Sequence, residues 1–251
     1  MAERSLYELA QEAYGRSVRA VAYGDIANLF AAFTFYMRGN AEGDAFRELW
    51  SKRDDVKYVA DGKGYAGREA VEAFMVKMRE AQRQEKLSML AALFPGEIKD
   101  SPEYLGAGDY DFHWLTTPNI RIADDLKTAK GAWWSPGIKA EVGPDGEMRS
   151  YLHTVNFGCD FINEDGQWKI WHLREFEEFS YPVAGSVVDM TGRQGQTRKE
   201  LEKRLEAGAP KWNVEKTAME PATKFRVARM LPDVVKPYDT WDDSMSCIRD
   251  Y

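Results

Sequence analysis

The stretch DFINEDGQWKIWH, residues Asp160–His172, decides the fold of this chain. Its centre, Asn163–Gly166, combines acidic residues with a glycine, a composition typical of a tight hairpin turn. Hydrophobic residues flank the turn on both sides, so one strand is expected to end before it and another to run from Trp168 to Phe176. The chain is therefore predicted to contain an antiparallel hairpin as the last unit of a sheet.

The strand before this turn is predicted to have two different faces. Because successive side chains of a strand point to opposite sides, alternate residues share a face. One face would carry Tyr151, His153, Val155, Phe157, Cys159 and Phe161, and the other Leu152, Thr154, Asn156, Gly158 and Asp160. Further strands are expected at 120–122 and 128–134, followed by a break at Ser135–Gly137 and a turn at Gly143–Gly146.

The first half of the chain has the spacing of helices. Apolar residues recur at about every third or fourth position from Val18 to Met37, which predicts one long helix. A short helix is expected at Asp44–Trp50, a strand at Val56–Val59, and a third helix from Gly67 to Leu90 or beyond. Helices followed by a meander of strands predict an α+β fold, in which a curved antiparallel sheet wraps around the long helix as a cone.

The C-terminal part has a different composition. A charged helix is expected at Thr197–Ala207, and the residues after it are rich in proline with little periodicity. We expect residues 1–182 to form the α+β domain and residues 183–251 to form a helical or extended arm packed on the domain or on a partner subunit. A partly disordered tail is the alternative.

Composition excludes several classes of function. The 251 residues carry a net charge of -7 with dispersed basic residues, so no nucleic-acid partner is expected. No apolar run approaches the roughly 18 residues of a membrane span, which predicts a cytoplasmic protein with no membrane partner. The two cysteines are expected to be free thiols. Eight Trp, twelve Tyr and twelve Phe favour an aromatic-lined pocket for a small molecule, although large interfaces would also explain them.

Several motifs carry a family resemblance that runs from Val18 to Pro182. They are Leu49–Val56, Tyr65–Gly67, Thr117–Ile120, Lys127–Gly131, Trp134–Gly137 and Asp160–His172. With these motifs the chain resembles the SnoaL-like, or nuclear transport factor 2-like, superfamily. The resemblance implies the cone-shaped fold with an open end. The long C-terminal arm and the Trp-Ser-Pro-Gly motif are most similar to the larger branch, which includes lyases that release formaldehyde from lignin-derived diarylpropane diols.

The resemblance leaves the chemistry open, because one fold hosts many functions. The superfamily includes dehydratases, isomerases, cyclases and non-catalytic binding proteins. The leading hypothesis is a cofactor-independent lyase acting on a small aromatic hydroxylated compound, which would dehydrate and deformylate a diarylpropane diol to a stilbene and formaldehyde. The alternatives are a dehydratase or isomerase of a steroid-like or polyketide substrate, with Asp25 or Asp160 as its acid, and a ligand-binding protein without catalysis.

Candidate catalytic residues follow from residue chemistry and from the resemblance. A histidine can transfer a proton near neutral pH, and a tyrosine can donate a hydrogen bond to a developing oxyanion. The candidate catalytic residues are His113, His153, Tyr58 and Lys139. The candidate substrate-binding residues are Tyr36, Trp133, Trp134, Asn156, His172 and Arg174. Each also has a structural alternative, since buried tyrosines and histidines often only satisfy hydrogen bonds and surface lysines are common.

No sequence motif indicates a metal or cofactor. The chain contains no metal-ligand spacing, phosphate-binding glycine loop, nucleophile elbow or dinucleotide fingerprint. We therefore expect no cofactor and no metal. The resemblance, together with last-strand residues that are large and apolar on both faces, predicts a homodimer formed through the open face of the sheet. The substrate's identity and stereochemistry stay open at this stage.

Overall fold

The order of elements places the helices before a long meander of strands. The computed structural model describes residues 5–38, 41–60, 62–183, 213–215 and 237–249. The helices are α1 (Leu6–Arg38), α2 (Glu42–Leu49), α3 (Arg68–Glu72), the π-helical turn η1 (Ala73–Met78), α4 (Arg79–Leu93), and the short η2 (Pro102–Tyr104) and η4 (Asp243–Met245). The strands are β1 (Lys57–Ala60), β2 (Lys63–Ala66), β3 (Asp109–His113), β4 (Thr116–Ile122), β5 (Thr128–Val142), β6 (Met148–Glu164), β7 (Gln167–Pro182) and β8 (Val214–Glu215).

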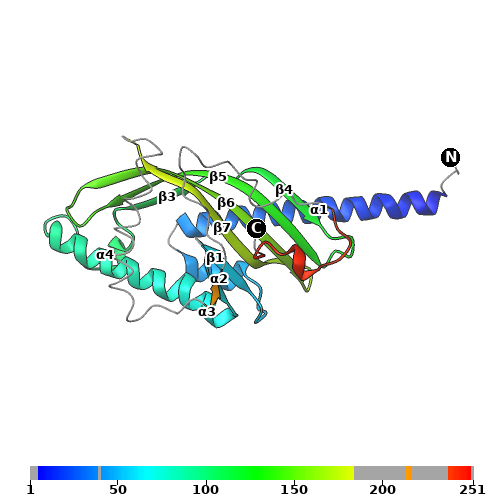
Figure 1. The fold of residues 1–251 in the computed structure, drawn as a ribbon, viewed down its shortest axis with the longest axis horizontal. Helices are drawn as coiled ribbons and strands as arrows, with labels where there is room; N and C mark the ends of the chain where they lie inside the picture. Colours follow the sequence, from blue (N-terminus) through cyan, green and yellow to red (C-terminus); the bar gives the residue numbers. More distant parts are fainter. Residues whose placement is uncertain (1–4, 39–40, 61, 184–212, 216–236, 250–251) are drawn as a thin grey trace.

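The strands form one curved sheet with the order β3-β5-β6-β7-β1-β2-β8, and β4 pairs with β5 beyond the end of β3. The long strands β5, β6 and β7 are antiparallel neighbours, whereas β1 runs parallel to β7, so the sheet is mixed. The sheet curves over the long helix α1 (Figure 1). The predicted α+β fold with a cone-like sheet around the first helix is therefore confirmed, but the sheet is mixed where an antiparallel one was predicted, because β1 pairs with β7 in parallel.

The hydrophobic core lies between α1 and one face of the sheet, which is called the inner face below. Phe30 of α1 stacks on Trp133 of β5 with ring centroids 4.2 Å apart and meets Phe157 of β6 edge-on at 5.5 Å. The alternation predicted for β6 is confirmed, because Val155, Phe157, Cys159 and Phe161 are all buried in this core. The opposite side of the sheet is the outer face.

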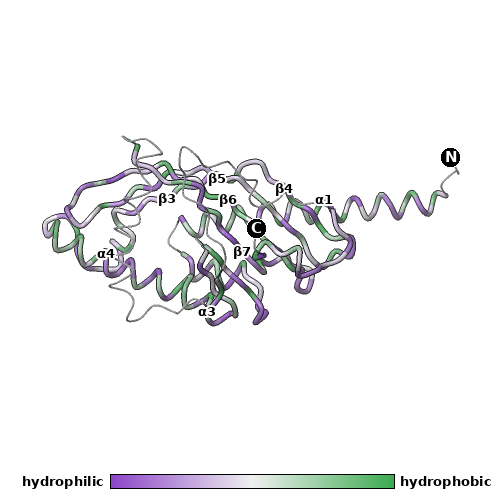
Figure 2. The backbone as a smooth tube through the Cα atoms, viewed as in Figure 1, coloured by the Kyte–Doolittle hydropathy of each residue, from purple (hydrophilic) through white to green (hydrophobic). Residues whose placement is uncertain are grey.

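The beginning of α1 projects beyond the sheet (Figure 1) and mixes hydrophilic with hydrophobic residues (Figure 2). The helix begins at Leu6, well before the predicted start at Val18. An open hollow on this projecting part is lined by Tyr7, Ala10, Gln11 and Tyr14. It does not reach the inner face, so the aromatic-lined pocket predicted from composition stays a prediction.

The predicted break at Ser135–Gly137 is wrong, because β5 continues through it from Thr128 to Val142. Pro136 lacks a backbone N–H and is tolerated only where no partner needs that donor. Such a position exists here, since β4 pairs with β5 up to Trp134 and β3 begins its pairing at Gly137. The Pro136 carbonyl still accepts a hydrogen bond from the backbone N–H of Trp114.

The C-terminal segment 237–249 covers part of the outer face, where its Cys247 and Ile248 pack against Val59 of β1. Any dimer contact on this face must therefore use the uncovered part, where Trp134 is 60 % exposed, and the homodimer stays a prediction. The predicted helix Thr197–Ala207 lies outside the described residues, so the division at residue 182 also stays a prediction. Among the described helices, none has the length and apolar character to cross a membrane.

Candidate active site

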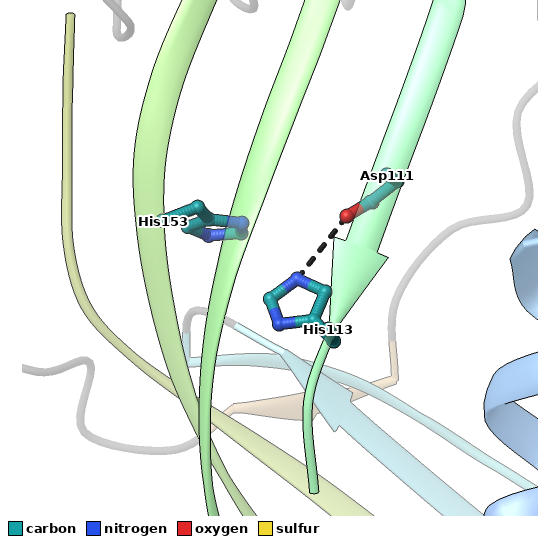
Figure 3. Close-up of side chains that lie close together, drawn as sticks. All are labelled: Asp111, His113 and His153. Atoms are coloured by element: carbon teal, nitrogen blue, oxygen red, sulfur yellow. Dashed lines mark ion pairs between the residues drawn. The ribbon is translucent and has the colours of Figure 1, made fainter. Parts of the chain in front are cut away.

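Asp111, His113 and His153 meet on the inner face near one edge of the sheet. Asp111 and His113 lie on β3 and His153 on β6, and both imidazoles point into the same space (Figure 3). The Nε2 atom of His113 is 3.1 Å from Oδ1 of Asp111, and the two imidazole centroids are 5.1 Å apart. Asp111 is half-exposed, whereas both histidine side chains are 14 % exposed. The group therefore lies just inside the edge of the sheet.

Gly137 makes this arrangement possible. It pairs with His113 on one side and with His153 on the other, so it separates the two histidines in the sheet. A Cβ atom at Gly137 would lie 2.7 Å from Nδ1 of His113 and 2.4 Å from the Phe112 carbonyl oxygen. Only a glycine lets the His113 ring lie across β5 toward its partner.

Both nitrogens of His113 face oxygen acceptors. Nε2 faces the Asp111 carboxylate, and Nδ1 is 3.2 Å from the backbone oxygen of Ser135. Only the doubly protonated ring can donate to both oxygens. Burial opposes this charge, but the Asp111 hydrogen bond and charge outweigh it and raise the pKa of His113. Burial likewise opposes the charge of Asp111, yet the hydrogen bond from His113 and the charges of His113 and Lys139 lower its pKa to about 2.

His153 is in the opposite situation. Among the described residues, neither of its ring nitrogens has a hydrogen-bond partner, and both atoms are buried. Oε1 of Glu177 is 3.6 Å from its Nε2, which is an ion-pair distance but too long for a hydrogen bond. The buried hydroxyl of Ser135 also lacks a partner within the described chain. On the inner face, one imidazole therefore has an acceptor at each nitrogen, and the imidazole beside it has no hydrogen-bond partner among the described residues.

A second polar group lies further along the same face. Tyr58 of β1, 1 % exposed, makes a side-chain hydrogen bond to Glu175 of β7. Burial raises the pKa of Glu175, although the Arg79 charge and the Tyr58 hydrogen bond act against this shift. Arg79 follows the π-helical turn η1, and such turns are frequent at functional sites. The Glu175 charge also contributes, as the smallest of several causes, to the raised pKa of His113.

Lys139, the fourth predicted catalytic residue, pairs directly with Asp111 across β3 and β5. Its charge contributes to the lowered pKa of that carboxyl group. Of the four predicted catalytic residues, the structure brings His113 and His153 together and places Lys139 beside Asp111, whereas Tyr58 contacts Glu175 further along the face. Their catalytic role stays a prediction.

Three of these side chains could also hold a metal ion. One donor atom each from Asp111, His113 and His153 lies within 4.8 Å of the others, although the sequence spacing indicated no metal site. Two histidines and one carboxylate are a ligand set that several divalent metals accept. A proton between His113 and Asp111 satisfies these two groups equally well, because their side chains are in direct contact at 3.1 Å.

The predicted substrate-binding residues lie elsewhere. Tyr36 donates a hydrogen bond to Glu48, which raises its pKa, and Trp133 is stacked in the core against Phe30. Trp134 is 60 % exposed and points to the outer face, on the opposite side of the sheet from its neighbour Trp133. The Nδ2 group of Asn156 on the outer face donates to Glu178 at 3.0 Å. None of these four joins the Asp111–His113–His153 group in the structure.

His172 and Arg174 lie on the outer face beneath the C-terminal segment. Nδ1 of His172 is 3.0 Å from Oδ2 of Asp160, and Arg174 donates to the backbone oxygen of Arg249. Asp160 is fully buried there, and Asp25 is exposed on α1, so neither supplies an acid inside the cone. The structure offers Glu175 for that role instead.

Sequence reasoning missed Asp111, Ser135 and Glu175. A signal existed for the first, because Asp111 and His113 have the same parity in β3 and must share a face. Ser135 was not recognised as a site residue, because its motif was interpreted as a break in the strand. Glu175 follows a register shift between β6 and β7, and its partly buried position depends on the pairing with β1.

Comparisons with known proteins agree with this fold. A family model described as the SnoaL-like domain matches residues 18–174. A search of curated proteins found no match. Among solved structures, a hexachlorocyclohexane dehydrochlorinase LinA-type3 from Novosphingobium barchaimii is similar, with a TM-score of 0.43 and 16 % identity over 66 % of this chain and 93 % of that one.

Two further solved structures are similar at comparable levels. A protein of unknown function from Mycobacterium tuberculosis has a TM-score of 0.47 and 14 % identity, covering 77 % of this chain and 94 % of its own. An NTF2-like protein from Novosphingobium aromaticivorans has a TM-score of 0.40 and 17 % identity, covering 74 % and 94 %. The family model matches most of the sheet and the helices before it, and the chain therefore belongs to the SnoaL-like domain family.

Proposed function

We propose that this protein is a cofactor-independent lyase that removes a hydroxyl group from a small aromatic compound by general acid and base catalysis. The observation that supports it best is the contrast between two neighbouring imidazoles. Both nitrogens of His113 face oxygen acceptors, on Asp111 and on the Ser135 carbonyl, and its pKa is raised, whereas neither nitrogen of His153 has a hydrogen-bond partner among the described residues. The two rings face each other across a centroid distance of 5.1 Å, and we assign His113 as the proton donor and His153 as the proton acceptor.

In this proposal the two histidines have distinct roles. His113 donates its proton to a benzylic hydroxyl, which leaves as water, and Asp111 stabilises the positive charge of the ring before the transfer. His153 removes a proton from the substrate on the other side of the bond that forms. Solvent then returns the proton from His153 to His113, so the enzyme ends the cycle unchanged.

The finer proposal is deformylation of a 1,2-diarylpropane-1,3-diol. His153 would take the proton of the terminal hydroxyl, the carbon–carbon bond to that carbon would break, and its electrons would form the new double bond as the benzylic hydroxyl leaves. The products are a stilbene, formaldehyde and water, which together contain all atoms of the diol. A para-hydroxyl on the benzylic ring would assist departure by stabilising a quinone methide.

The test uses purified protein without added cofactor and a 1,2-diarylpropane-1,3-diol with a para-hydroxyl ring. We expect stilbene absorbance in the ultraviolet and formaldehyde in equal amount. Conversion without formaldehyde would contradict the deformylation but retain a dehydration. Recovery of unchanged diol, bound to the protein, would contradict the lyase and favour a binding protein.

One observation favours a second candidate, an isomerase or dehydratase of a polycyclic substrate. Glu175 is a carboxyl group whose pKa burial raises, and Tyr58 donates to it inside the cone. Such a carboxyl could carry a proton between two carbons while a tyrosine stabilises the enolate oxygen. Activity on a 3-keto-5-ene steroid that is lost in Glu175→Gln but kept in His113→Gln would favour this candidate.

A further inference from the structure

Ser135 is fully buried, and its hydroxyl has no partner within the described residues. It lies on the inner face of β5, between Trp133 of the core and Gly137 of the candidate site. Its backbone oxygen already accepts the hydrogen bond from Nδ1 of His113. The backbone of Ser135 therefore positions the acid, and its side chain lies on the same face as His113 and His153.

Three unpartnered polar atoms lie together at this place. Of the seven buried side-chain atoms without a partner in the described part of the chain, three are Oγ of Ser135 and the two ring nitrogens of His153. Ser135 pairs with Val155 and Gly137 pairs with His153, so Ser135 and His153 are diagonal neighbours on the same face. Folded proteins rarely leave buried polar atoms unpaired, and such atoms call for an explanation.

The chemistry of these atoms indicates what would satisfy them. A serine hydroxyl can donate, a neutral imidazole nitrogen can accept, and an alcohol group can do both at once. A carboxylate would be repelled by Asp111 and Glu177, which lie next to the two histidines. An alcohol is neutral, so these two carboxylates do not repel it.

We propose that Ser135 and His153 together bind a second hydroxyl group of the substrate, so that the enzyme selects diols. This inference rests on the proposed lyase function and adds Ser135 as the residue that distinguishes a diol from a mono-alcohol. His153 accepts the proton of this hydroxyl, and Ser135 donates a hydrogen bond to the same oxygen as negative charge develops on it. The first hydroxyl is the one that leaves at His113.

The test measures binding, so that it does not depend on turnover. The dissociation constants of a 1,2-diarylpropane-1,3-diol and of the matching 1,2-diarylpropan-1-ol are compared by calorimetry in His113→Gln, with and without Ser135→Ala. We expect Ser135→Ala to weaken binding of the diol by about 3- to 30-fold and to leave the mono-alcohol unchanged. Equal weakening of both ligands, or of neither, would overturn the proposal.

The melting temperature gives a second, independent readout. Removing an unpaired buried hydroxyl should stabilise the protein, so Ser135→Ala should melt about 2–4 °C higher. The matched control is Ser51→Ala, because Ser51 is also fully buried but its hydroxyl donates to Glu164 and accepts from the N–H of Arg53. That control should melt lower and bind both ligands normally. A lower melting temperature for Ser135→Ala would show a structural hydroxyl and contradict the inference.

The lyase and the diol selectivity can fail separately. If no alcohol is converted but Ser135→Ala still weakens binding of the diol alone, the proposed reaction is contradicted and the hydroxyl subsite is supported. If the diol is converted and Ser135→Ala does not weaken binding of the diol selectively, the subsite is contradicted and the lyase function is supported.

Discussion

Two Asp–His pairs lie on opposite faces of the same sheet, and their surroundings differ. On the inner face, His113 is 3.1 Å from a half-exposed Asp111, beside His153 and Ser135, whose side-chain polar atoms have no hydrogen-bond partner among the described residues. On the outer face, His172 is 3.0 Å from a fully buried Asp160. Asp160 also accepts hydrogen bonds from Lys130, Ser246 and the backbone N–H of Cys247.

The difference shows that an Asp–His pair alone does not identify a site. The outer pair is enclosed by the chain's own C-terminal segment, and its oxygens are all engaged, so it fastens that segment to the sheet. The inner pair has the same contact distance but neighbours that still need partners. Open hydrogen-bonding capacity, and not the pair itself, marks the face where a ligand belongs.

The largest expected effect is on stability at the outer pair. Asp160→Ala would leave Lys130 buried without its counter-charge and would free the backbone of Cys247. Breaking a buried ion pair in this way costs about 3–5 kcal/mol of unfolding free energy. Urea unfolding measures it, with Asp111→Ala as the matched change at the half-exposed inner pair. A loss at Asp111→Ala as large as that at Asp160→Ala would erase the distinction between the two pairs.

The next effect is on catalysis at the inner pair. Removing a general acid typically lowers turnover by about 10²-fold or more, and we expect this for His113→Gln. The counterpart on the outer face, His172→Gln, should keep its turnover while losing stability, because His172 contacts Asp160 and not the inner face. Steady-state kinetics on the diol, together with melting curves, separate the two outcomes. Equal turnover of His113→Gln and the native protein would remove His113 from the mechanism.

The sequence alone predicted the fold well and the site in part. Apolar spacing from Val18 to Met37 and alternation in β6 depend on local geometry, which is why this helix and this strand were predicted, although α1 begins earlier, at Leu6. His113 and His153 come together only through Gly137, which separates them in the sheet, and this contact depends on the registers of three strands. Ser135 and Glu175 could not be assigned, because their burial and partners arise from pairings between distant segments.

A smaller effect is expected at Gly137, which tests the geometry of the inner pair without removing a functional group. The Cβ atom of Gly137→Ala would overlap His113 and the Phe112 carbonyl, so the imidazole must move from its contacts. A displacement of about 1 Å can lower turnover up to about 10²-fold, and we expect a loss of about 10-fold or more. The control is Gly24→Ala in α1, where no atom lies within 4 Å of the new methyl group. Full turnover in Gly137→Ala would show that the position of His113 is unimportant.

The smallest effect concerns pH. Because the pKa of His113 is raised, its acid form persists above the ordinary pH range of histidine, and activity should fall only as pH rises through the raised value. Asp111→Asn removes the carboxylate that holds this proton, so the alkaline limb of kcat should move to lower pH by about one unit or more.

Several other ionisable groups share this face with His113 and can change how kcat depends on pH. They are Arg79, Lys139, His153, Glu175 and Glu177. The control must therefore change one nearby carboxylate and leave the others in place. Asp109→Asn does this, since Asp109 lies two residues before Asp111 on β3 but pairs with Lys86. A shift of the alkaline limb in Asp111→Asn alone would identify His113 as the acid. The same shift in both variants would mean that general surface charge, and not the inner Asp–His pair, sets the pH dependence.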